Sequence, residues 1–174
     1  MRLRNLFATL SAIALLVAPA TSAAAAPIRP VSPDADFLIA VHQANLTQIK
    51  AGKIAAKKGG SATVRDLGQQ FVTFHRKLDA QVKKAAHTVD VRLPDSPNSE
   101  QTTLLRQYKT ASTAEFDTLF VGSQILAHQR AFKMAQIAVD TGTNPAVKHI
   151  VATATPVVQK HYAALQQMGG AAQQ

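Results

Sequence analysis

The chain has 174 residues, of which 47% are hydrophobic, and a formal net charge of +9 from 19 basic and 10 acidic side chains. This length is enough for one domain with its own core, and a basic surface of this kind attracts polyanions. No cysteine is present. The sequence therefore excludes disulfides, thiolate nucleophiles, thiolate metal ligands and a lipid-modified cysteine.

The N-terminal segment has the pattern of a secretory signal peptide. Residues 1–4 carry Arg2 and Arg4, residues 6–17 form an apolar run, and residues 23–26 are alanines that suit a signal peptidase after Ala24 or Ala26. The apolar run is shorter than the roughly 20 residues that span a bilayer. We expect a signal peptide over residues 1–26 and a periplasmic or secreted protein that is soluble and is not a lipoprotein. A retained N-terminal anchor is the alternative.

Helical periodicity dominates the rest of the chain, which we divide into a linker over residues 27–33, a bundle over 34–168 and a flexible tail over 169–174. The first helix has Ser32 as its N-cap and Pro33 at its first position, and Gly59 and Gly60 end it. A second helix follows the N-cap Ser61 and extends to about Thr88. No later segment is long and apolar enough to cross a membrane.

A long connection over residues 89–111 then carries Pro94, Pro97 and one short amphipathic helix around residues 104–108. The next long helix opens with a capping box between Ser112 and Glu115 and extends to about residue 140. The last helix begins after Asn144. We expect Pro156 to kink it, and Gly169 and Gly170 to end it.

Four long helices and one long connection predict a specific topology. Short loops join the first two helices and the last two, so each pair forms an antiparallel hairpin. The connection is long enough to return along the whole bundle. We therefore predict an all-α, ferritin-like four-helix bundle whose crossover carries the short extra helix. A simple up-and-down bundle is the alternative.

Three histidines fall near the middle of three different long helices. His75, His128 and His161 should lie at a similar level, and Asp79 follows His75 by one helical turn. Three imidazoles can bind a single zinc, copper or iron ion, with Asp79 as a further ligand or as a partner that orients the ring. The alternative is that His161 lies on the apolar stripe and hydrogen-bonds to a neighbouring side chain or water, while His75 and His128 lie at stripe edges and are partly exposed. Gln48 is expected at the same level, on the inward face of the first helix.

Carboxylates are too scarce for a di-iron site of the ferritin type. Such a site needs about four glutamates and two histidines, whereas this chain has only Glu100 and Glu115. The sequence also lacks a Gly-x-Ser-x-Gly elbow and a phosphate-binding loop. We leave catalysis open and favour a protein that is not an enzyme.

Lysines cluster near the end of the first helix, at Lys50, Lys53, Lys57 and Lys58. A solvated helix face is the common meaning of such a cluster, and a site for an anionic polymer of the cell envelope is the functional one. Two tyrosines and no tryptophan argue against nucleic acid as the partner, because few bases could stack.

Several short motifs resemble a known family. They are residues 51–55 (Ala-Gly-Lys-Ile-Ala), 71–78 (Phe-Val-Thr-Phe-His-Arg-Lys-Leu), 127–131 (Ala-His-Gln-Arg-Ala) and 160–161 (Lys-His). In order and spacing they resemble the exported, ferritin-like bacterial family called domain of unknown function 4142, over about residues 34–168. The resemblance implies a ferritin-like bundle outside the cytoplasm, with a histidine at each of the three positions. It implies no activity.

The chain also departs from that family's pattern. Members tend to carry glutamates where this chain has Gln48 and Lys50, and an acidic residue where Phe74 and Ala127 stand. A carboxylate-based metal site of the family would therefore be lost here. Our preferred interpretation is a binding or structural protein of the cell envelope or exterior. A histidine-based metal-binding or redox protein is the first alternative, and a polyanion-binding bundle is the second.

Overall fold

A computed structural model describes residues 32–171 of the protein. These residues form five α-helices and no strand: α1 (Pro33–Lys58), α2 (Ala62–Thr88), α3 (Ser99–Thr110), α4 (Thr113–Thr141) and α5 (Pro145–Ala171). The all-α prediction is confirmed. The predicted signal peptide, most of the predicted linker and the last three residues of the predicted tail lie outside the described residues.

The predicted helix starts are confirmed by their capping hydrogen bonds. The side chains of Ser32, Ser61 and Ser112 each accept a bond from a backbone amide of the first turn. At Ser112 the capping box with Glu115 is complete. A second capping box, between Asn98 and Gln101, starts α3. Each cap satisfies a backbone donor that has no partner inside its helix.

The predicted end of α5 is wrong. The helix continues through Gly169 and Gly170 to Ala171. A Cβ atom at Gly169 would lie 3.3 Å from Cδ1 of Ile125, so the backbone of α5 runs close to α4 there. Packing against α4 explains why the helix extends past residues that often terminate one.

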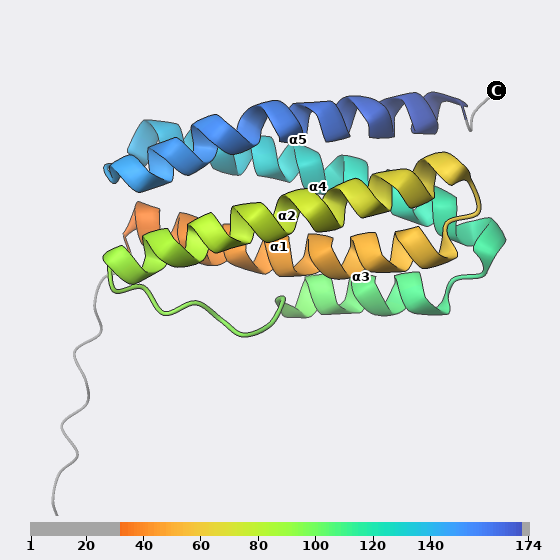
Figure 1. The fold of residues 1–174 in the computed structure, drawn as a ribbon, viewed down its shortest axis with the longest axis horizontal. Helices are drawn as coiled ribbons and strands as arrows, with labels where there is room; N and C mark the ends of the chain where they lie inside the picture. The colour runs from red at the N-terminus through yellow and green to blue at the C-terminus, as the bar shows by residue number, and fades with distance from the viewer. Residues whose placement is uncertain (1–31, 172–174) are drawn as a thin grey trace, which may run out of the picture. The chain divides into compact units, whose positions relative to one another are not determined.

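The four long helices form two antiparallel hairpins, α1 with α2 and α4 with α5 (Figure 1). The crossover after α2 returns along the bundle and carries α3 beside α1, so that α4 runs parallel to α2. This is the ferritin-like arrangement with one long crossover. None of the helices in the described region is long and apolar enough to cross a membrane.

The buried apolar side chains form two separate clusters, one toward each end of the bundle. The first contains Phe37, Leu38, Val41, Leu78, Val82, Ala85, Ala86, Ala138, Val147, Ile150 and Val151. The second contains Ala51, Ala55, Val64, Leu67, Phe71, Leu105, Tyr108, Phe116, Phe120, Val121 and Leu165. On every long helix, the residues between these two sets include a buried polar side chain.

We call this middle level the polar layer. Its members are Asn45 and Gln48 on α1, His75 on α2, Gln124 and His128 on α4, and His161 on α5. All six are at least 93% buried. Buried polar groups lower stability unless they are hydrogen-bonded, so the two apolar clusters must stabilise the bundle around this layer.

The crossover is anchored beside the polar layer by His42. Its Nδ1 lies 2.6 Å from Oδ1 of Asp79, and its Nε2 lies 2.9 Å from the carbonyl oxygen of Pro94. Both neighbours accept hydrogen bonds, so the ring donates from both nitrogens when it is protonated. Lys83 contributes a second ion pair to Asp79 at 2.9 Å. These contacts hold the segment before α3 against α1 and α2.

Helices α1 and α2 approach each other closely at two glycines. A Cβ atom at Gly68 would lie 2.7 Å from the carbonyl oxygen of Gly52, and one at Gly52 would lie 2.5 Å from the carbonyl oxygen of Gly68. Neither oxygen can move without shifting its helix. The α1–α2 hairpin, the most extensive contact between two helices of the bundle, therefore depends on both glycines.

We expect Gly68→Ala to lower the free energy of unfolding by about 1–3 kcal/mol, because the added methyl group would overlap the backbone of α1. The matched control is Gly122→Ala on α4, where nothing lies within 4 Å of the added Cβ. There the loss of glycine's backbone freedom should raise stability by roughly 0.5–1 kcal/mol. Urea denaturation measures both values. Equal effects of the two substitutions would contradict the close packing described here.

Candidate ligand-binding groove

The structure brings His75, His128 and His161 together in the polar layer, as their positions along the helices suggested. The ring centroids of His75 and His161 are 6.1 Å apart, and those of His128 and His161 are 5.9 Å apart. The ring of Phe71 packs against all three imidazoles, at centroid distances of 4.8–5.8 Å. All three histidines are buried.

Hydrogen bonds fix the tautomers of two of these rings. Nδ1 of His128 lies 2.8 Å from the backbone carbonyl oxygen of Gln124 in the preceding turn. Nδ1 of His75 lies 2.9 Å from Oδ1 of Asn45 on α1. Both partners are acceptors, so each Nδ1 carries the proton and each Nε2 has a free lone pair.

The polar layer concentrates buried polar atoms that have no hydrogen-bond partner within the protein. Seven such side-chain atoms occur in the described part of the chain, and six belong to this layer. They are Nδ2 of Asn45, Oε1 of Gln48, Nε2 of His75, Oε1 of Gln124, Nε2 of His128 and Nδ1 of His161. An unpaired buried group costs about 1–3 kcal/mol, so such a cluster calls for a partner from outside the protein, either ordered water or a bound ligand.

The pKa values of all three histidines are lowered, so the neutral rings are favoured. Burial is the main cause in each case. The neighbouring imidazoles lower the pKa of His75 further, while the bond to the Gln124 carbonyl partly offsets the effect in His128. The pKa of His161 falls from 6.5 to about 4. Neutral imidazoles can accept hydrogen bonds or bind metal ions.

A groove of about 800 Å³ opens beside this layer, between α1, α3 and α4. His75 and His128 line it, as do many uncharged polar side chains: Gln43, Thr47, Gln48, Asn98, Ser99, Gln101, Thr103, Gln107, Ser123 and Gln124. The charged residues of its lining are Glu100 and Arg130, which pair with each other at 2.6 Å and are largely exposed. The size suits a small-molecule ligand.

Asp79 does not join the histidines. Its carboxylate binds His42 and Lys83, whereas His75 is oriented by Asn45. The expected pairing of Asp79 with His75 fails because the carboxylate reaches across to α1 and forms a shorter, charge-assisted bond there. The sequence position of His42, just beside the apolar stripe, gave no sign of this burial.

No three histidine, aspartate or glutamate side chains within residues 32–171 meet closely enough to hold a metal ion. Three imidazoles on one tetrahedral ion would have ring centroids about 5 Å apart, from the usual metal–nitrogen distance. The two measured separations are about 6 Å. The rings would therefore have to approach one another before they could share an ion.

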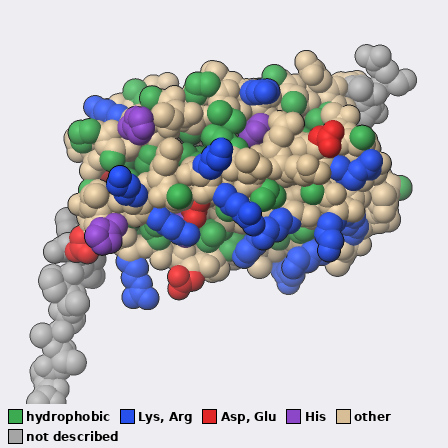
Figure 2. Space-filling model, in the orientation of Figure 1, with side chains coloured by type: hydrophobic (Ala, Val, Ile, Leu, Met, Phe, Trp, Pro, Cys, Tyr) green, Lys and Arg blue, Asp and Glu red, His purple; other side chains and the backbone are tan. Residues whose placement is uncertain are grey.

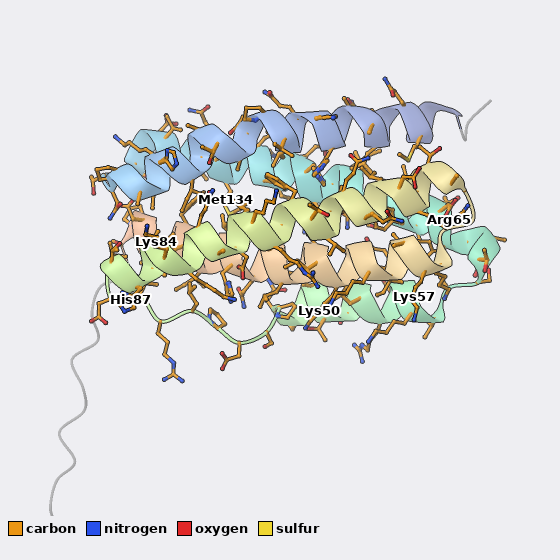
Figure 3. All side chains as sticks on the ribbon, in the orientation of Figure 1. Lys50, Lys57, Arg65, Lys84, His87 and Met134 are labelled. Carbon is orange, nitrogen blue, oxygen red and sulfur yellow. The ribbon has the colours of Figure 1, made fainter. Side chains whose placement is uncertain are left out.

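The four lysines of α1 differ in their surroundings. Lys50, Lys53 and Lys57 are exposed, and Lys50 and Lys57 project on the side of α3 in Figure 3. Lys58 instead donates to the carbonyl oxygens of Tyr108 and Lys109, at 3.3 and 2.7 Å, and so stabilises the end of α3. Figure 2 shows further Lys and Arg side chains gathered over the same face of the bundle.

Two residues of the site were missed from the sequence. Asn45 and Gln124 each fall one turn from a residue already singled out, Gln48 and His128 respectively. Their amides suit an exposed helix face as well as a buried one, so composition alone does not mark them. A polar residue at an inward-facing position of all four long helices is the signal that could have identified the layer.

The lowered pKa values predict a loss of stability in acid. Between the ordinary pKa of 6.5 and the value of about 4 for His161, the unfolded chain binds more protons than the folded one. Stability should therefore be complete above about pH 6.5 and fall by about 1–3 kcal/mol as the pH drops toward 4. Urea denaturation in chelator-treated buffer measures this change. His161→Leu should flatten the dependence of the free energy of unfolding on pH. The control His149→Leu changes an exposed histidine of α5 and should leave this dependence unchanged. Identical pH dependences for the two variants would contradict the assignment of the acid effect to His161.

A comparison with protein families agrees with the motifs around the three histidines. The family model of the domain of unknown function DUF4142 matches residues 18–168. No curated protein and no solved structure shows significant similarity to the chain. The match covers all of the bundle except the last three residues of α5, and it includes all six residues of the polar layer. The chain therefore belongs to the DUF4142 family.

Proposed function

We propose that this protein is a binding protein, not an enzyme, and that its groove takes up a small ligand with several hydrogen-bond donors. The observation that carries the proposal is the set of unpaired acceptors under the groove. Gln48, His75, Gln124 and His128 all line the groove, and each has a buried acceptor atom without a partner. A ligand that donates to these atoms would remove the cost of their burial.

The four unpaired acceptor atoms belong to residues that line the groove, and each exposes less than 1 Å². The terminal torsion of a glutamine is soft and has two broad minima. The amide of Gln48 can therefore rotate at low cost when a ligand binds. The amide of Gln124 is more constrained, because its Nε2 donates to the hydroxyl of Tyr108 at 3.1 Å.

Binding without catalysis fits the chemistry of the lining. The imidazoles are neutral and already oriented, and the carboxylate and guanidinium of the lining are paired with each other at its rim. The signal-peptide pattern of residues 1–26 supports a place for this binding protein in the cell envelope or outside the cell.

Replacing an unpaired acceptor should stabilise the empty protein and weaken binding. We expect Gln48→Met, which keeps the volume and removes the buried oxygen, to raise the free energy of unfolding by about 1–2 kcal/mol. We also expect small polyols and primary amides to raise the thermal unfolding temperature of the unsubstituted protein. The same substitution should abolish this effect. Urea denaturation and thermal unfolding with a panel of these compounds provide the two measurements.

The control is Gln69→Met, which changes an exposed glutamine of α2. It should leave both stability and ligand response unchanged. A fall in stability with Gln48→Met would show that Gln48 has a structural role in the layer, and the proposal would then lose its main support.

A second candidate function is the binding of a single zinc, copper or iron ion, favoured by the fixed tautomers. His75 and His128 donate from Nδ1 to oxygen acceptors and leave Nε2 free, the arrangement found in most metal-binding histidines. His161 offers an unpaired Nδ1 nearby. The rings need to approach by about 1 Å, as judged from the metal–nitrogen distances of tetrahedral sites.

Equilibrium dialysis with zinc, copper or iron tests this candidate. We expect one ion per chain and a higher thermal unfolding temperature in the unsubstituted protein. His128→Leu should remove both effects, whereas His87→Ala, at an exposed position near the end of α2 (Figure 3), should leave them intact. Equal uptake by the two variants would place any bound ion elsewhere on the surface.

A further inference from the structure

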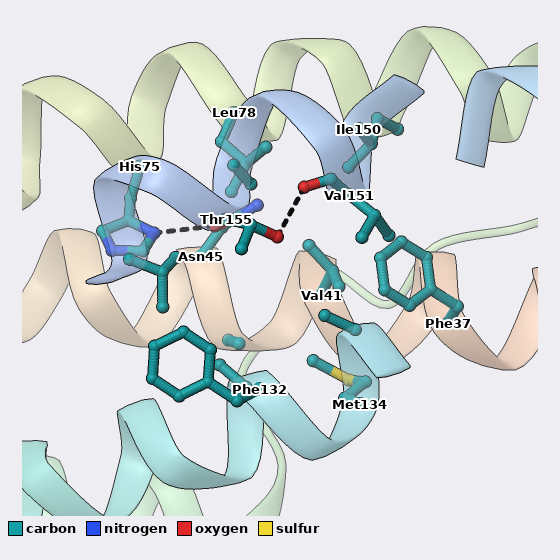
Figure 4. A pocket seen from close by; sticks show the side chains of 15 residues that line it. Phe37, Val41, Asn45, His75, Leu78, Phe132, Met134, Ile150, Val151 and Thr155 are labelled. Atoms are coloured by element: carbon teal, nitrogen blue, oxygen red, sulfur yellow. Dashed lines mark hydrogen bonds between the residues drawn. The ribbon is translucent and has the colours of Figure 1, made fainter. Parts of the chain in front are cut away.

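The groove shares a wall with a second, apolar cavity of about 70 Å³. Five residues line both spaces: Ala44 of α1, His75 of α2, Ala131 and Met134 of α4, and Val158 of α5. In Figure 4, His75 and Asn45 lie at one end of the cavity and Phe37 lies at the other. The shared wall is thus mostly apolar, and His75 is the member of the polar layer that belongs to it.

The cavity has the character of a site for hydrocarbon. Apart from Asn45, His75 and Thr155, its lining residues are aliphatic, aromatic or methionine side chains. Thr155 directs its hydroxyl away, to the carbonyl oxygen of Val151 at 2.7 Å. One water molecule needs roughly 10–15 Å³ of such space and two to four polar partners. The volume is thus several times larger than one water molecule requires, and its walls provide few partners for water.

The lining of the groove indicates which polar group could be joined to such a hydrocarbon. Its unpaired acceptors call for a head group rich in donors, such as hydroxyl groups. The atoms concerned are Oε1 of Gln48 and Gln124 and Nε2 of His75 and His128, and each of them accepts hydrogen bonds. Its charged lining residues, Glu100 and Arg130, neutralise each other. A charged head group would find a counter-ion among these residues only by breaking their pair, whereas an uncharged head group leaves the pair intact.

We infer that the ligand is an uncharged amphiphile, with a polyol head in the groove and a short alkyl chain in the apolar cavity. This inference rests on the proposed binding function and adds the chemical class of the ligand. Met134 and Val158, which line both spaces, would lie beside the junction of head and chain. The flexible side chain of Met134 in the shared wall can adjust when the alkyl chain of the ligand enters the cavity.

Hexyl glucoside is the probe. Glucose serves as the head group alone, and hexanoate serves as an alkyl chain one carbon shorter on a charged head group that lacks donors. Isothermal titration calorimetry with the full chain should give hexyl glucoside at least about tenfold tighter binding than either, since burying even two methylene groups contributes more than a factor of ten. Binding no tighter than that of glucose would overturn the alkyl site. Equal binding of hexanoate would overturn the uncharged polyol head.

Two substitutions test whether the alkyl chain of the ligand lies in the apolar cavity. Ala154→Leu fills the cavity from α5 and should weaken hexyl glucoside at least about fivefold, while glucose binding stays unchanged. Ala135→Leu fills it from α4 and should act in the same way, so the test does not depend on one variant folding well. Ala152→Leu is the control, because Ala152 lies on α5 but is exposed. Unchanged affinity in both cavity variants would overturn the inference.

The outcome separates this inference from the proposed function. If glucose and hexyl glucoside bind equally, and both lose affinity in Gln48→Met, the groove binds polar ligands and only the amphiphile inference fails. If Gln48→Met lowers stability and neither compound binds, the proposed function and this inference both fail.

Discussion

The burial of a complete layer of uncharged polar side chains across the middle of the bundle is the constraint on which the rest of the structure depends. Six side chains from four helices lie between two apolar clusters, and each has one polar atom without a partner. The free energy that stabilises the fold must come from the two ends. Close packing of α1 on α2 at Gly52 and Gly68 is one such contribution. Such a layer weakens the middle of a bundle, which is consistent with selection for function over stability.

The polar layer lies at the same level as the groove on the side of the bundle. The hairpin partners α1 and α2 are packed closely, whereas α1 and α4 are in more limited contact and leave the groove between them. The crossover forms the outer rim of this groove through the start of α3. His42, bonded to Asp79 and Pro94, keeps that rim in place. The buried hydrogen bonds of His42 therefore support the shape of the groove, although His42 contributes no group to the groove itself.

The same histidines serve the two functional hypotheses in different ways. As hydrogen-bond acceptors, His75 and His128 act through Nε2 together with the glutamine oxygens, and the present ring separations need no change. As metal ligands they require His161 as well, and the rings must move closer. Phe71 lies against all three imidazoles, so a movement of the rings also requires its packing to change. This difference is why we place ligand binding before metal binding.

Much of the fold could be predicted because local signals repeat along the chain. Ser32, Ser61 and the Ser112–Glu115 box mark helix starts through hydrogen bonds within one turn, and such bonds need no tertiary partner. The end of α5 could not be predicted, because Gly169 remains helical where its backbone lies against α4. The level of His75, His128 and His161 along the bundle follows from helix rise and loop position, which the sequence contains.

The sequence by itself determined the helices, their order, the long crossover and the common level of the three histidines. Only the tertiary structure decided how each helix is rotated about its axis, and this rotation sets the partners of every polar side chain. It directed Asp79 toward His42 and not toward His75, and it placed Gln124 and Asn45 in the core. It also created the groove and the apolar cavity, which form where helices from distant parts of the chain pack incompletely. Periodicity identifies the buried face of each helix, but the residue opposite it depends on packing against the other helices.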